Sequence, residues 1–417
     1  MKFIHAADIH LDSPLVGLAA YPDAPADQLR SATRDAFTAL VDLAIEEAVD
    51  FMVIAGDLYD GAWRDYNTGI FFCKEMGRLK RSGIPVFVLF GNHDAESEMT
   101  KKLDLPDNVK VFPANKPATF HIEKLAVALH GQSFKLKETT SNLVTGYPAA
   151  QAGRFNIGVL HTALEGYSTH ANYAPCTVDE LHAKGYQYWA LGHIHEFEQW
   201  VGLSTIVFPG NLQGRNVREC GRRGAVLVTV DENGDAVVER ILIDVLRWEN
   251  LEVDATSCSS LEDVTRLIGA ALQSLLDTDG HVPRAVRVTV SGRSKAHGQL
   301  FGLEPQLRAE VLAQIASIGN ERLWLEKVRI QTKAATTQES VHEHIDAFAD
   351  LQSILGAAAA DPAFTAALQT VLAPFVARTP LDLQVLVPLL EQIRQGDLQG
   401  LIDEVAPGLL AHLSQVN

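Results

Sequence analysis

The sequence predicts an α/β protein that continues into a small α+β domain and a helical C-terminal region. Over residues 2–245, short apolar segments such as 51–55 (FMVIA) and 85–90 (PVFVLF) alternate with longer segments of helical periodicity. Strands that are apolar throughout are typical of a sheet covered on both faces. The chain has 417 residues, 47% hydrophobic and 21% charged, which is a globular balance. Its length corresponds to roughly two to four domains.

The elements of the first 245 residues follow from these periodicities. Strands are expected at 2–7, 51–55, 85–90, 156–160, 187–191 and 205–208. Helices are expected at 29–48, where Leu40, Leu43 and Ala44 recur at helical spacing, and at 68–81. Residues 226–230 and 236–243 flank Asn233-Gly234, a pair that suits a type I′ turn, so a hairpin is expected there.

The rest of the chain divides into two regions, which gives domains at 1–245, 246–334 and 335–417. In the second, Ser259 and Glu262 form a capping-box pair, and strands and helices follow in β-α-β-α-β order. The third is helical and rich in Ala and Leu. Prolines are expected to divide it into short helices. They are Pro362, Pro374, Pro380, Pro388 and Pro407.

Charge limits the possible partners. The net charge of −17 argues against general electrostatic attraction to DNA or to anionic membranes. Residues 336–417 hold ten acidic residues against two arginines, so almost half of the excess acid sits in the last fifth of the chain. The possibility of a nucleic-acid-binding surface on residues 1–335 is therefore weakened but not excluded.

Membrane spans and oxidised cysteines are not expected. The apolar stretches fall short of the ~18–20 residues that a spanning helix needs, and Asp8 lies where a signal peptide would still be apolar. The four cysteines lie far apart, which excludes a cysteine zinc site and a disulfide scaffold and fits a reducing compartment. We expect a cytoplasmic protein without membrane association.

Five polar segments follow predicted strands, or end them. They are Asp8-Ile9-His10, Gly56-Asp57-Leu58-Tyr59-Asp60, Gly91-Asn92-His93-Asp94, Leu160-His161-Thr162 and Gly192-His193-Ile194-His195. Because parallel strands present their carboxyl ends to one crevice, these segments can converge. The D-x-H and H-x-H spacings place both side chains on one side of an extended backbone.

The donors in these segments are carboxylates, imidazoles and one amide oxygen, without a thiolate. Mixed oxygen and nitrogen ligation suits Mn²⁺, Fe or Zn²⁺. Seven ligands are too many for one ion but suit two ions that share a bridge such as Asp57, an arrangement that serves phosphate-ester hydrolysis. Each segment alone is found by chance in turns, whereas all five in order predict a metal site.

These motifs resemble the calcineurin-like metallophosphoesterases. The opening MKFIHAADIHL, the segment GDLYD at 56–60 and the segment PGNLQGR at 209–215 are more closely similar to the SbcD-type DNA repair exonuclease subunits of the YhaO-like branch. The resemblance implies a two-sheet metallophosphoesterase core covered by helices, with a small α+β cap and a helical tail. It is strong over 1–245, moderate over 246–334 and weak beyond.

The resemblance also implies roles for single residues. One metal would be held by Asp8, His10, Asp57 and His195, and the second by Asp57, Asn92, His161 and His193. His93 would face the scissile phosphate with Asp94 orienting its imidazole, and Mn²⁺ would be the preferred ion. Some relatives carry a histidine where this chain has Asp60, so the role of that position stays open.

Other residues bear on the substrate. Four arginines in the loop 209–224 are expected to contact DNA phosphates, with a solvated loop as the alternative. They are Arg215, Arg218, Arg222 and Arg223. Tyr59, Trp63, Arg64 and Tyr66 flank the Asp57 loop and could stack on a base, although packing against a neighbouring helix is the preferred interpretation.

The resulting prediction is a metal-dependent DNA exonuclease or endonuclease subunit, with a homodimer as a possible assembly. A phosphatase or phosphodiesterase for nucleotides or small molecules is the first alternative, and a catalytically inactive scaffold is the second. The resemblance implies a coiled-coil ATPase partner of the SbcC or YhaN type that docks to residues 336–417, unless this tail folds back onto the cap. Two apolar stripes support docking. They are Ile345, Phe348, Leu351, Ile354 and Leu355, and then Phe364, Leu368, Val371, Leu372 and Phe375.

Overall fold

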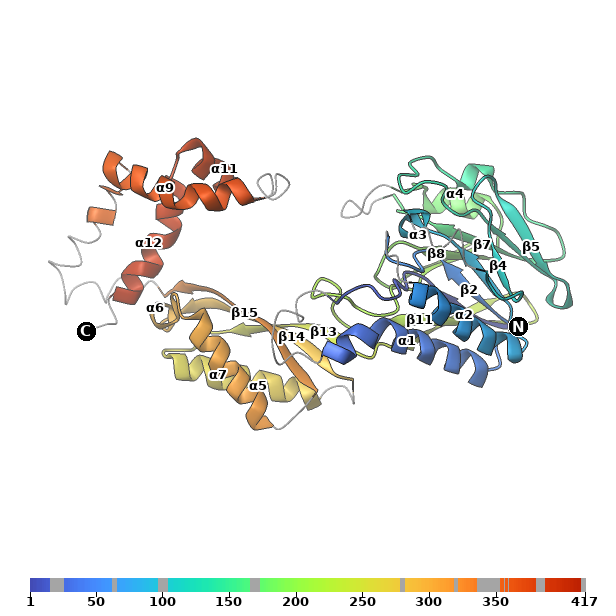
Figure 1. The fold of residues 1–417 in the computed structure, drawn as a ribbon, viewed down its shortest axis with the longest axis horizontal. Helices are drawn as coiled ribbons and strands as arrows, with labels where there is room; N and C mark the ends of the chain where they lie inside the picture. Colours follow the sequence, from blue (N-terminus) through green and yellow to red (C-terminus); the bar gives the residue numbers. More distant parts are fainter. Residues whose placement is uncertain are drawn as a thin grey trace. The chain divides into compact units, whose positions relative to one another are not determined.

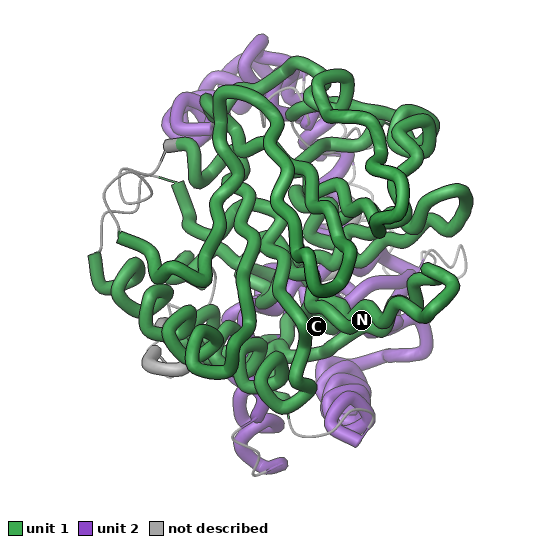
Figure 2. The backbone as a smooth tube through the Cα atoms, turned by 90° about the vertical axis from the view of Figure 1, so that its right-hand side faces the viewer, with its two compact units in different colours: residues 1–249, 281–285 green, residues 250–280, 286–417 purple. Residues whose placement is uncertain are grey.

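The structure is a computed structural model that forms two compact units (Figures 1 and 2). One unit comprises Met1–Glu249 with His281–Ala285, and the other comprises Asn250–Gly280 with Val286–Asn417. The residues described are 1–15, 26–61, 66–96, 104–165, 173–277, 282–318, 322–335, 353–355, 357–358, 360–379 and 387–413. Six residues named above lie outside these ranges. They are Trp63, Arg64, Ile345, Phe348, Leu351 and Pro380.

The first unit is built from two six-stranded sheets. The first sheet has the order β12 (Ala236–Leu242), β11 (Gly224–Val230), β1 (Lys2–Ala6), β2 (Phe51–Ala55), β3 (Val86–Leu89) and β4 (Val109–Val111). The second has the order β5 (Ala118–Ile122), β6 (Val127–Gly131), β7 (Phe155–His161), β8 (Tyr188–Gly192), β10 (Thr205–Phe208) and β9 (Glu198–Val201). Strands β1 to β4 run parallel, as do β6, β7, β8 and β10, so each sheet has an edge of carboxyl ends.

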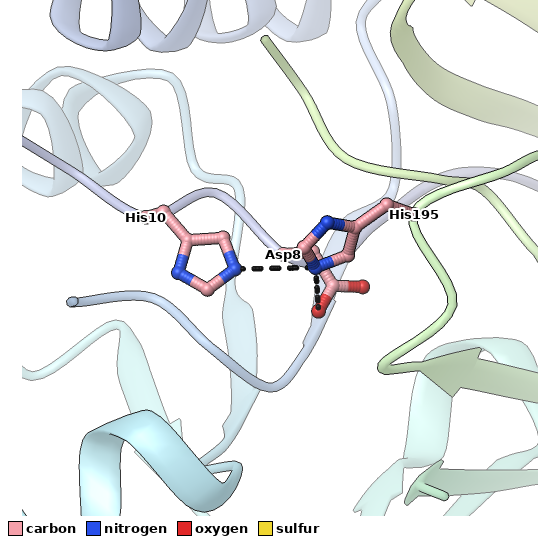
Figure 3. Close-up of side chains that lie close together, drawn as sticks. All are labelled: Asp8, His10 and His195. Atoms are coloured by element: carbon pink, nitrogen blue, oxygen red, sulfur yellow. Dashed lines mark hydrogen bonds and ion pairs between the residues drawn. The ribbon is translucent and has the colours of Figure 1, made fainter. Parts of the chain in front are cut away.

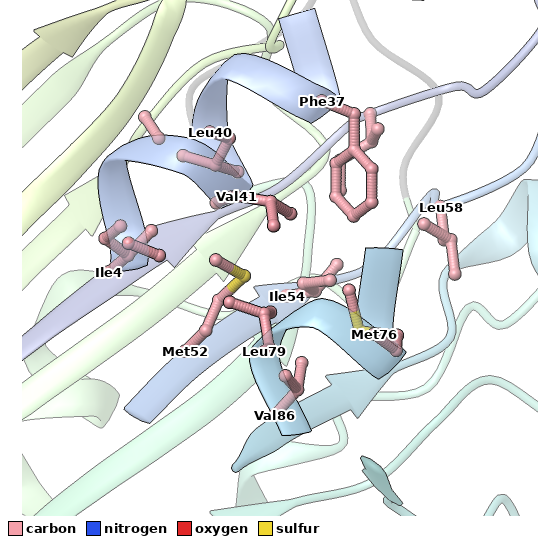
Figure 4. Packing of buried hydrophobic residues seen from close by; sticks show 14 of the residues in the cluster. Ile4, Phe37, Leu40, Val41, Met52, Ile54, Leu58, Met76, Leu79 and Val86 are labelled. Carbon is pink, nitrogen blue, oxygen red and sulfur yellow. The ribbon is translucent and has the colours of Figure 1, made fainter. Parts of the chain in front are cut away.

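Both faces of the first sheet are buried, as its apolar strands predicted. Met52 and Ile54 of β2 pack with helices α1 (Ala26–Glu46) and α2 (Tyr66–Arg81), as Figure 4 shows. Phe51 and Val53 point the other way, into a core shared with the second sheet. The outer face of the second sheet carries another apolar cluster around Trp189, which includes Leu181 of α4 (Val178–Ala183). Helices therefore cover one face of the predicted sheet, and a second sheet covers the other face.

The hairpin of β11 and β12 forms as expected, but its turn is not type I′. Gly234 has a φ of 86°, whereas Asn233 is not among the residues with positive φ. The amide of Gly234 donates to the carbonyl of Asp231, and the Asp231 side chain accepts from the amides of Asn233 and Asp235. A type I turn followed by a left-handed glycine closes such a loop, and the Asp231 carboxylate stabilises it.

The second unit contains a three-stranded sheet with two long helices packed on it. The strand order is β13 (Arg247–Asp254), β14 (Arg284–Ser294) and β15 (Leu323–Ala334), and the helices are α5 (Leu261–Asp277) and α7 (Glu304–Ile318). The predicted cap is shifted by one residue, because the side chain of Ser260 accepts from the amide of Asp263 at 3.2 Å. The carboxylate of Asp263 accepts in turn from the amide of Ser259 at 3.1 Å.

The C-terminal part of this unit contains the helices α9 (Pro362–Arg378), α11 (Pro388–Gln395) and α12 (Gln399–Leu413). Pro362 and Pro388 begin helices, but Pro374 and Pro407 lie inside α9 and α12, so two of the predicted breaks are wrong. Helix α12 packs against α6 (His297–Leu300), where a Cβ at Gly408 would lie 2.8 Å from the Phe301 ring. The division at 334/335 stays a prediction. No helix in the described ranges is long and apolar enough to span a bilayer.

Candidate metal centre

Four of the predicted ligands have an unusual backbone conformation. The φ angles are 49° at Asp8, 46° at His10, 50° at Asp57 and 105° at His193. Residues other than glycine rarely adopt positive φ, and such positions persist only where surrounding contacts hold them. Here the amide of Asp8 donates to the carbonyl of Gly56, and the amide of His10 donates to the carbonyl of Asp57, both at 3.0 Å. The ends of β1 and β2 are thereby locked together.

The three glycines before the polar segments leave room for the ligands. A Cβ at Gly56 would lie 2.2 Å from Nδ1 of His161, and one at Gly91 would lie 2.3 Å from Oδ1 of Asp57. A Cβ at Gly192 would lie 2.0 Å from the carbonyl oxygen of Ala55. These distances are far below van der Waals contact, so a side chain at any of the three would displace the site. Gly56 also has a φ of 100°, which favours glycine.

One group of donors consists of Asp8, His10 and His195 (Figure 3). The Nε2 atoms of His10 and His195 face each other at 3.4 Å, and Nε2 of His195 lies 3.7 Å from Oδ1 of Asp8. The ligand atoms of the group all lie within 4.8 Å of one another. Asp8 and His10 are buried, and His195 is partly buried.

A second group consists of Asp57, His161 and His193, all buried. Nε2 of His161 lies 3.5 Å from Oδ2 of Asp57 and 2.9 Å from Oδ1 of Asn92, which brings the predicted amide ligand to the same place. Oδ2 of Asp57 is also 3.9 Å from Nε2 of His10. The Asp57 carboxylate therefore lies between the two groups, as a bridging ligand would.

The tautomers of two histidines fit metal ligation. Nδ1 of His161 lies 3.0 Å from the carbonyl of Ala55, which can only accept, so Nδ1 carries the proton. Nδ1 of His195 likewise lies 2.8 Å from the Glu219 carboxylate. When these two rings are neutral, the lone pair of each Nε2 faces other hydrogen-bond acceptors, which is unfavourable. A cation bound between them would be coordinated by these lone pairs. Oxygen and imidazole donors of this kind suit divalent metal ions.

The electrostatics of the second group match this conclusion. Burial opposes the ionisation of Asp57, but His161 holds the pKa of its carboxyl well below the usual range. Burial would lower the pKa of His161, but the Asp57 carboxylate raises it to about 9. The buried, ionised Asp57 carboxylate is therefore stabilised by a positive charge beside it. A proton on His161 or a divalent ion can supply that charge.

His93 belongs to neither of these two donor groups, but its imidazole lies beside the candidate metal centre and is partly exposed. Its Nε2 lies 4.0 Å from Oδ2 of Asp57, and its Nδ1 lies 3.2 Å from Oδ1 of Asp60. Asp94 does not take the orienting position expected for it. Its carboxylate accepts from the backbone amides of Leu58, Tyr59 and Gly91 at 2.8–3.1 Å, so it braces two of the ligand loops. Burial, with Asp57 adding to the effect, raises the pKa of Asp94 to about 7.

The four arginines of the loop 209–224 have different surroundings. Arg218 and Arg222 are exposed. Arg215 is largely buried, donates to Glu219 at 3.0 Å and lies 3.8 Å from Asp60. Arg223 is 3% exposed and donates to Glu196, to the carbonyl of Cys220 and to the carbonyl of His195. The expected phosphate contact is therefore wrong for Arg223, whose side chain connects the loop 209–224 to the segment at His195 and Glu196.

Glu219 is a site residue that the sequence analysis missed. Its carboxylate accepts from His195, Arg215 and the side-chain amide of Asn211. Although burial opposes ionisation, His195 and Arg215 hold the pKa of Glu219 well below its usual range. A signal was available, since Glu219 is the single acid in a run of four arginines. Among the flanking aromatic residues, Tyr59 is buried against Phe72 as expected, whereas Tyr66 is 60% exposed.

Comparison with known proteins agrees with this geometry. The family model "Calcineurin-like phosphoesterase" matches residues 1–197, and the model "Metallophosphoesterase YhaO, middle domain" matches residues 248–333. The chain belongs to the calcineurin-like metallophosphoesterases, which makes it a hydrolase of phosphoester bonds with a centre for divalent metal ions. Within that family, it is 33% identical over 296 residues to the metallophosphoesterase YhaO of Bacillus subtilis, covering 70% of this chain and 72% of that protein.

More distant relatives carry a name that points to DNA. The DNA double-strand break repair protein Mre11 of Sulfurisphaera tokodaii is 28% identical over 263 residues, covering 58% of this chain and 63% of its own length. A crystal structure of a dimetal phosphatase from Danio rerio aligns with 58% of this chain and 99% of its own, at 11% identity and with a TM-score of 0.36. The resemblance expected from the motifs is thus confirmed at the level of the family.

Proposed function

We propose that this protein hydrolyses phosphodiester bonds in DNA with two divalent ions, and that Mn²⁺ is its preferred ion. The observation that carries the proposal is the place of Asp57, whose Oδ2 lies 3.9 Å from His10 and 3.5 Å from His161. Asp8, His10, Asp57 and His195 would hold one ion, and Asp57, Asn92, His161 and His193 the other. When bound, such a pair activates the attacking water and stabilises the attacking and leaving oxygens.

The remaining residues act on the substrate in this proposal. His93 is the partly exposed imidazole that faces the centre, so its Nε2 can hold a proton for the leaving oxygen. Arg218 and Arg222 are exposed on the loop behind His195 and can contact backbone phosphates. The name of the Mre11 relatives supports DNA as the substrate.

A smaller phosphoester is the second candidate. Arg215 and Arg223 are engaged with Glu219 and Glu196, which leaves fewer cations for a DNA backbone on a chain of net charge −17. The test is to incubate the purified protein and Mn²⁺ with labelled duplex DNA, single-stranded DNA, a chromogenic phosphodiester and nucleotide monoesters, with D57A as the control. DNA cleavage by the wild type alone supports the proposal. Turnover of small esters without DNA cleavage supports the second candidate, and inactivity on all substrates supports a scaffold.

We also propose that helix α9 docks a coiled-coil ATPase of the SbcC or YhaN type. The predicted stripe divides in the structure: Leu368 and Leu372 pack against the helical cluster, whereas Phe364, Val371 and Phe375 are 43%, 73% and 63% exposed. Exposed apolar side chains along one helix suit a helical partner. Helix α12 already packs on α6, so α9 is the more accessible surface of the tail.

The docking test replaces Phe364, Val371 and Phe375 by Ser and measures co-purification with such an ATPase from the same organism. The triple variant should lose the partner and keep its own hydrolytic activity. Val237→Ser is the matched control, because Val237 is 67% exposed on β12 in the other unit. Binding of the triple variant at the affinity of the wild type would contradict docking through α9.

A further inference from the structure

The loop 209–224 is fastened to the start of strand β13 by two buried side chains. They are Gln213 of the loop and Trp248 of the strand, which are 1% and 0% exposed. The Gln213 side chain accepts from the amide of Val245 at 2.9 Å and donates to the carbonyl of Leu246 at 2.5 Å. Because a carboxamide has both a donor and an acceptor, it can bond one backbone segment twice and hold it in one orientation.

Trp248 contacts the same loop at two further points. Its indole Nε1 donates to the carbonyl of Gly214 at 2.9 Å, and its carbonyl accepts from the amide of Gly221 at 2.9 Å. A Cβ at Gly214 would lie 3.0 Å from Cδ1 of Trp248 and 2.7 Å from the carbonyl oxygen of Glu219, so the chain is closely packed here. Gly214 and Gly221 flank Glu219 in the sequence. Trp248 therefore holds the segment that carries this carboxylate on both sides.

The Glu219 carboxylate transmits this support to the metal centre. It lies 2.8 Å from Nδ1 of His195 and accepts from the side-chain amide of Asn211 at 2.9 Å. The backbone amide of Asn211 donates to the carbonyl of His195 at 3.2 Å, so the loop contacts this histidine at its ring and at its main chain. An outer partner of a metal-binding imidazole sets the direction of the ring. A displaced Glu219 would therefore turn the ring of His195.

The strand that anchors the loop is also the strand by which the chain leaves the first unit. Strand β13 begins in that unit and continues beyond Glu249 into the second. The amide of Arg247 donates to the carbonyl of Pro283 at 2.8 Å, which bonds this end of β13 to the segment that leads into β14. The buried side chains of Arg247 and Asp244 pair at 2.8 Å and hold the turn before the strand.

We infer that Gln213 and Trp248 are positioning residues of the metal centre. By holding Glu219, they keep the His195 imidazole in the orientation that binds one of the two ions. The inference rests on the proposed place of His195 among the metal ligands. It also makes the start of β13 a point from which the centre can be altered, because a displaced strand would move the backbone anchors of the loop. The alternative is that these contacts contribute to stability alone.

The test compares Trp248→Phe and Gln213→Met with Trp189→Phe as a matched control. Trp189 is also 0% exposed and donates its Nε1 to the carbonyl of Leu181 at 3.1 Å, but it packs in the cluster on the outer face of the second sheet. The measurements are the affinities for two Mn²⁺ ions by titration calorimetry, the melting temperature, and the ¹⁵N shifts of His195 in histidine-labelled protein loaded with Zn²⁺.

All three variants lose a buried hydrogen bond and should melt at a lower temperature than the wild type. Trp248→Phe and Gln213→Met should in addition weaken the binding of one ion by about 10-fold or more and shift the His195 signal. Trp189→Phe should keep both affinities and the His195 signal of the wild type. This difference separates a positioning role from a contribution to stability.

A double variant tests the route through Glu219. If Trp248 acts on the metal by way of this carboxylate, Trp248→Phe should add little to the loss of affinity that Glu219→Gln causes by itself. Losses that add fully in the double variant would show that Trp248 does not act through Glu219, and would overturn the inference.

The remaining outcomes separate this inference from the proposed function. A wild type that binds fewer than two divalent ions would defeat the proposed two-ion function. A wild type with two ions, whose Trp248→Phe variant keeps both affinities and the same His195 signal, would overturn the role of Trp248 alone, even if its melting temperature falls. If Trp248→Phe does not fold, Gln213→Met decides by the same criteria.

Discussion

Nδ1 of His195 lies 2.8 Å from the Glu219 carboxylate, so the loop that follows β10 orients a histidine that follows β8. Outer partners of this kind set the tautomer and the direction of a metal ligand. Glu219→Gln should lower the affinity for one of two divalent ions by about 10- to 100-fold, as measured by titration calorimetry. Glu239→Gln on the exposed side of β12 is the control. Equal affinity in wild type and Glu219→Gln would show that the loop has no influence on the metal.

Asp57→Ala should abolish hydrolysis and reduce the metal content of both positions. The reason is that its carboxylate is shared, with Oδ2 near His10 on one side and near His161 on the other. Elemental analysis after dialysis measures bound metal, and circular dichroism checks that the variant is folded. Two tightly bound ions in the folded variant would defeat the bridging assignment.

His93→Ala should keep both ions and its affinity for DNA, while hydrolysis falls by a factor of about 100 or more. The imidazole faces the centre but lies outside the two donor groups that the proposed ions occupy. Metal analysis and single-turnover rates are measured on the same preparation. Parallel loss of metal and activity would instead make His93 a ligand.

The loop arginines should separate into two kinds. Replacing the exposed Arg218 and Arg222 by Ala should lower the melting temperature less than Arg223→Ala does, and it should reduce the salt dependence of DNA binding by up to about one phosphate equivalent for each. Arg223→Ala should lower the free energy of unfolding by about 1–3 kcal/mol, because the carbonyls of His195 and Cys220 lose the donor that Arg223 supplies. Denaturant titration and binding at several salt concentrations test both statements. An unchanged salt slope in the first pair would make this a solvated loop.

Gly158→Ala should destabilise the first unit by about 1–3 kcal/mol. Gly158 of β7 lies opposite Trp189 of β8, and a Cβ there would be 2.3 Å from the indole ring. Gly77→Ala in α2 is the matched control, since its nearest neighbour would be 3.8 Å away and Ala favours a helix by up to about 1 kcal/mol. Thermal unfolding of both variants gives the comparison, and equal stability of Gly158→Ala and wild type would contradict tight packing at this strand pair.

The strands that build the centre were predictable because they are uniformly apolar. The predicted segments 51–55 and 205–208 have the same bounds as β2 and β10. A strand that is buried on both faces is an unbroken apolar run, so its ends can be read from the sequence. Strands β4, β5, β6 and β9 were not predicted. Strand β4 has three residues, and the residues of β5 and β9 are mostly half-exposed or exposed, so their sequences carry little apolar periodicity. Strand β6 is buried throughout, but His130 interrupts its short apolar run.

The order of the motifs by itself determined the family and the set of donors, because the chemistry of a metal ligand depends on residue type and on its place after a strand. Only the tertiary structure decided which neighbours those donors have. Glu219 and Arg223 are charged residues in a loop, and their sequence neighbours do not distinguish a solvated charge from a buried one. Their contacts with His195 and Glu196 are formed by chain folding across 24 and 27 residues. Such contacts depend on how loops from two sheets come together at the carboxyl ends of their strands, and local sequence patterns do not specify that arrangement.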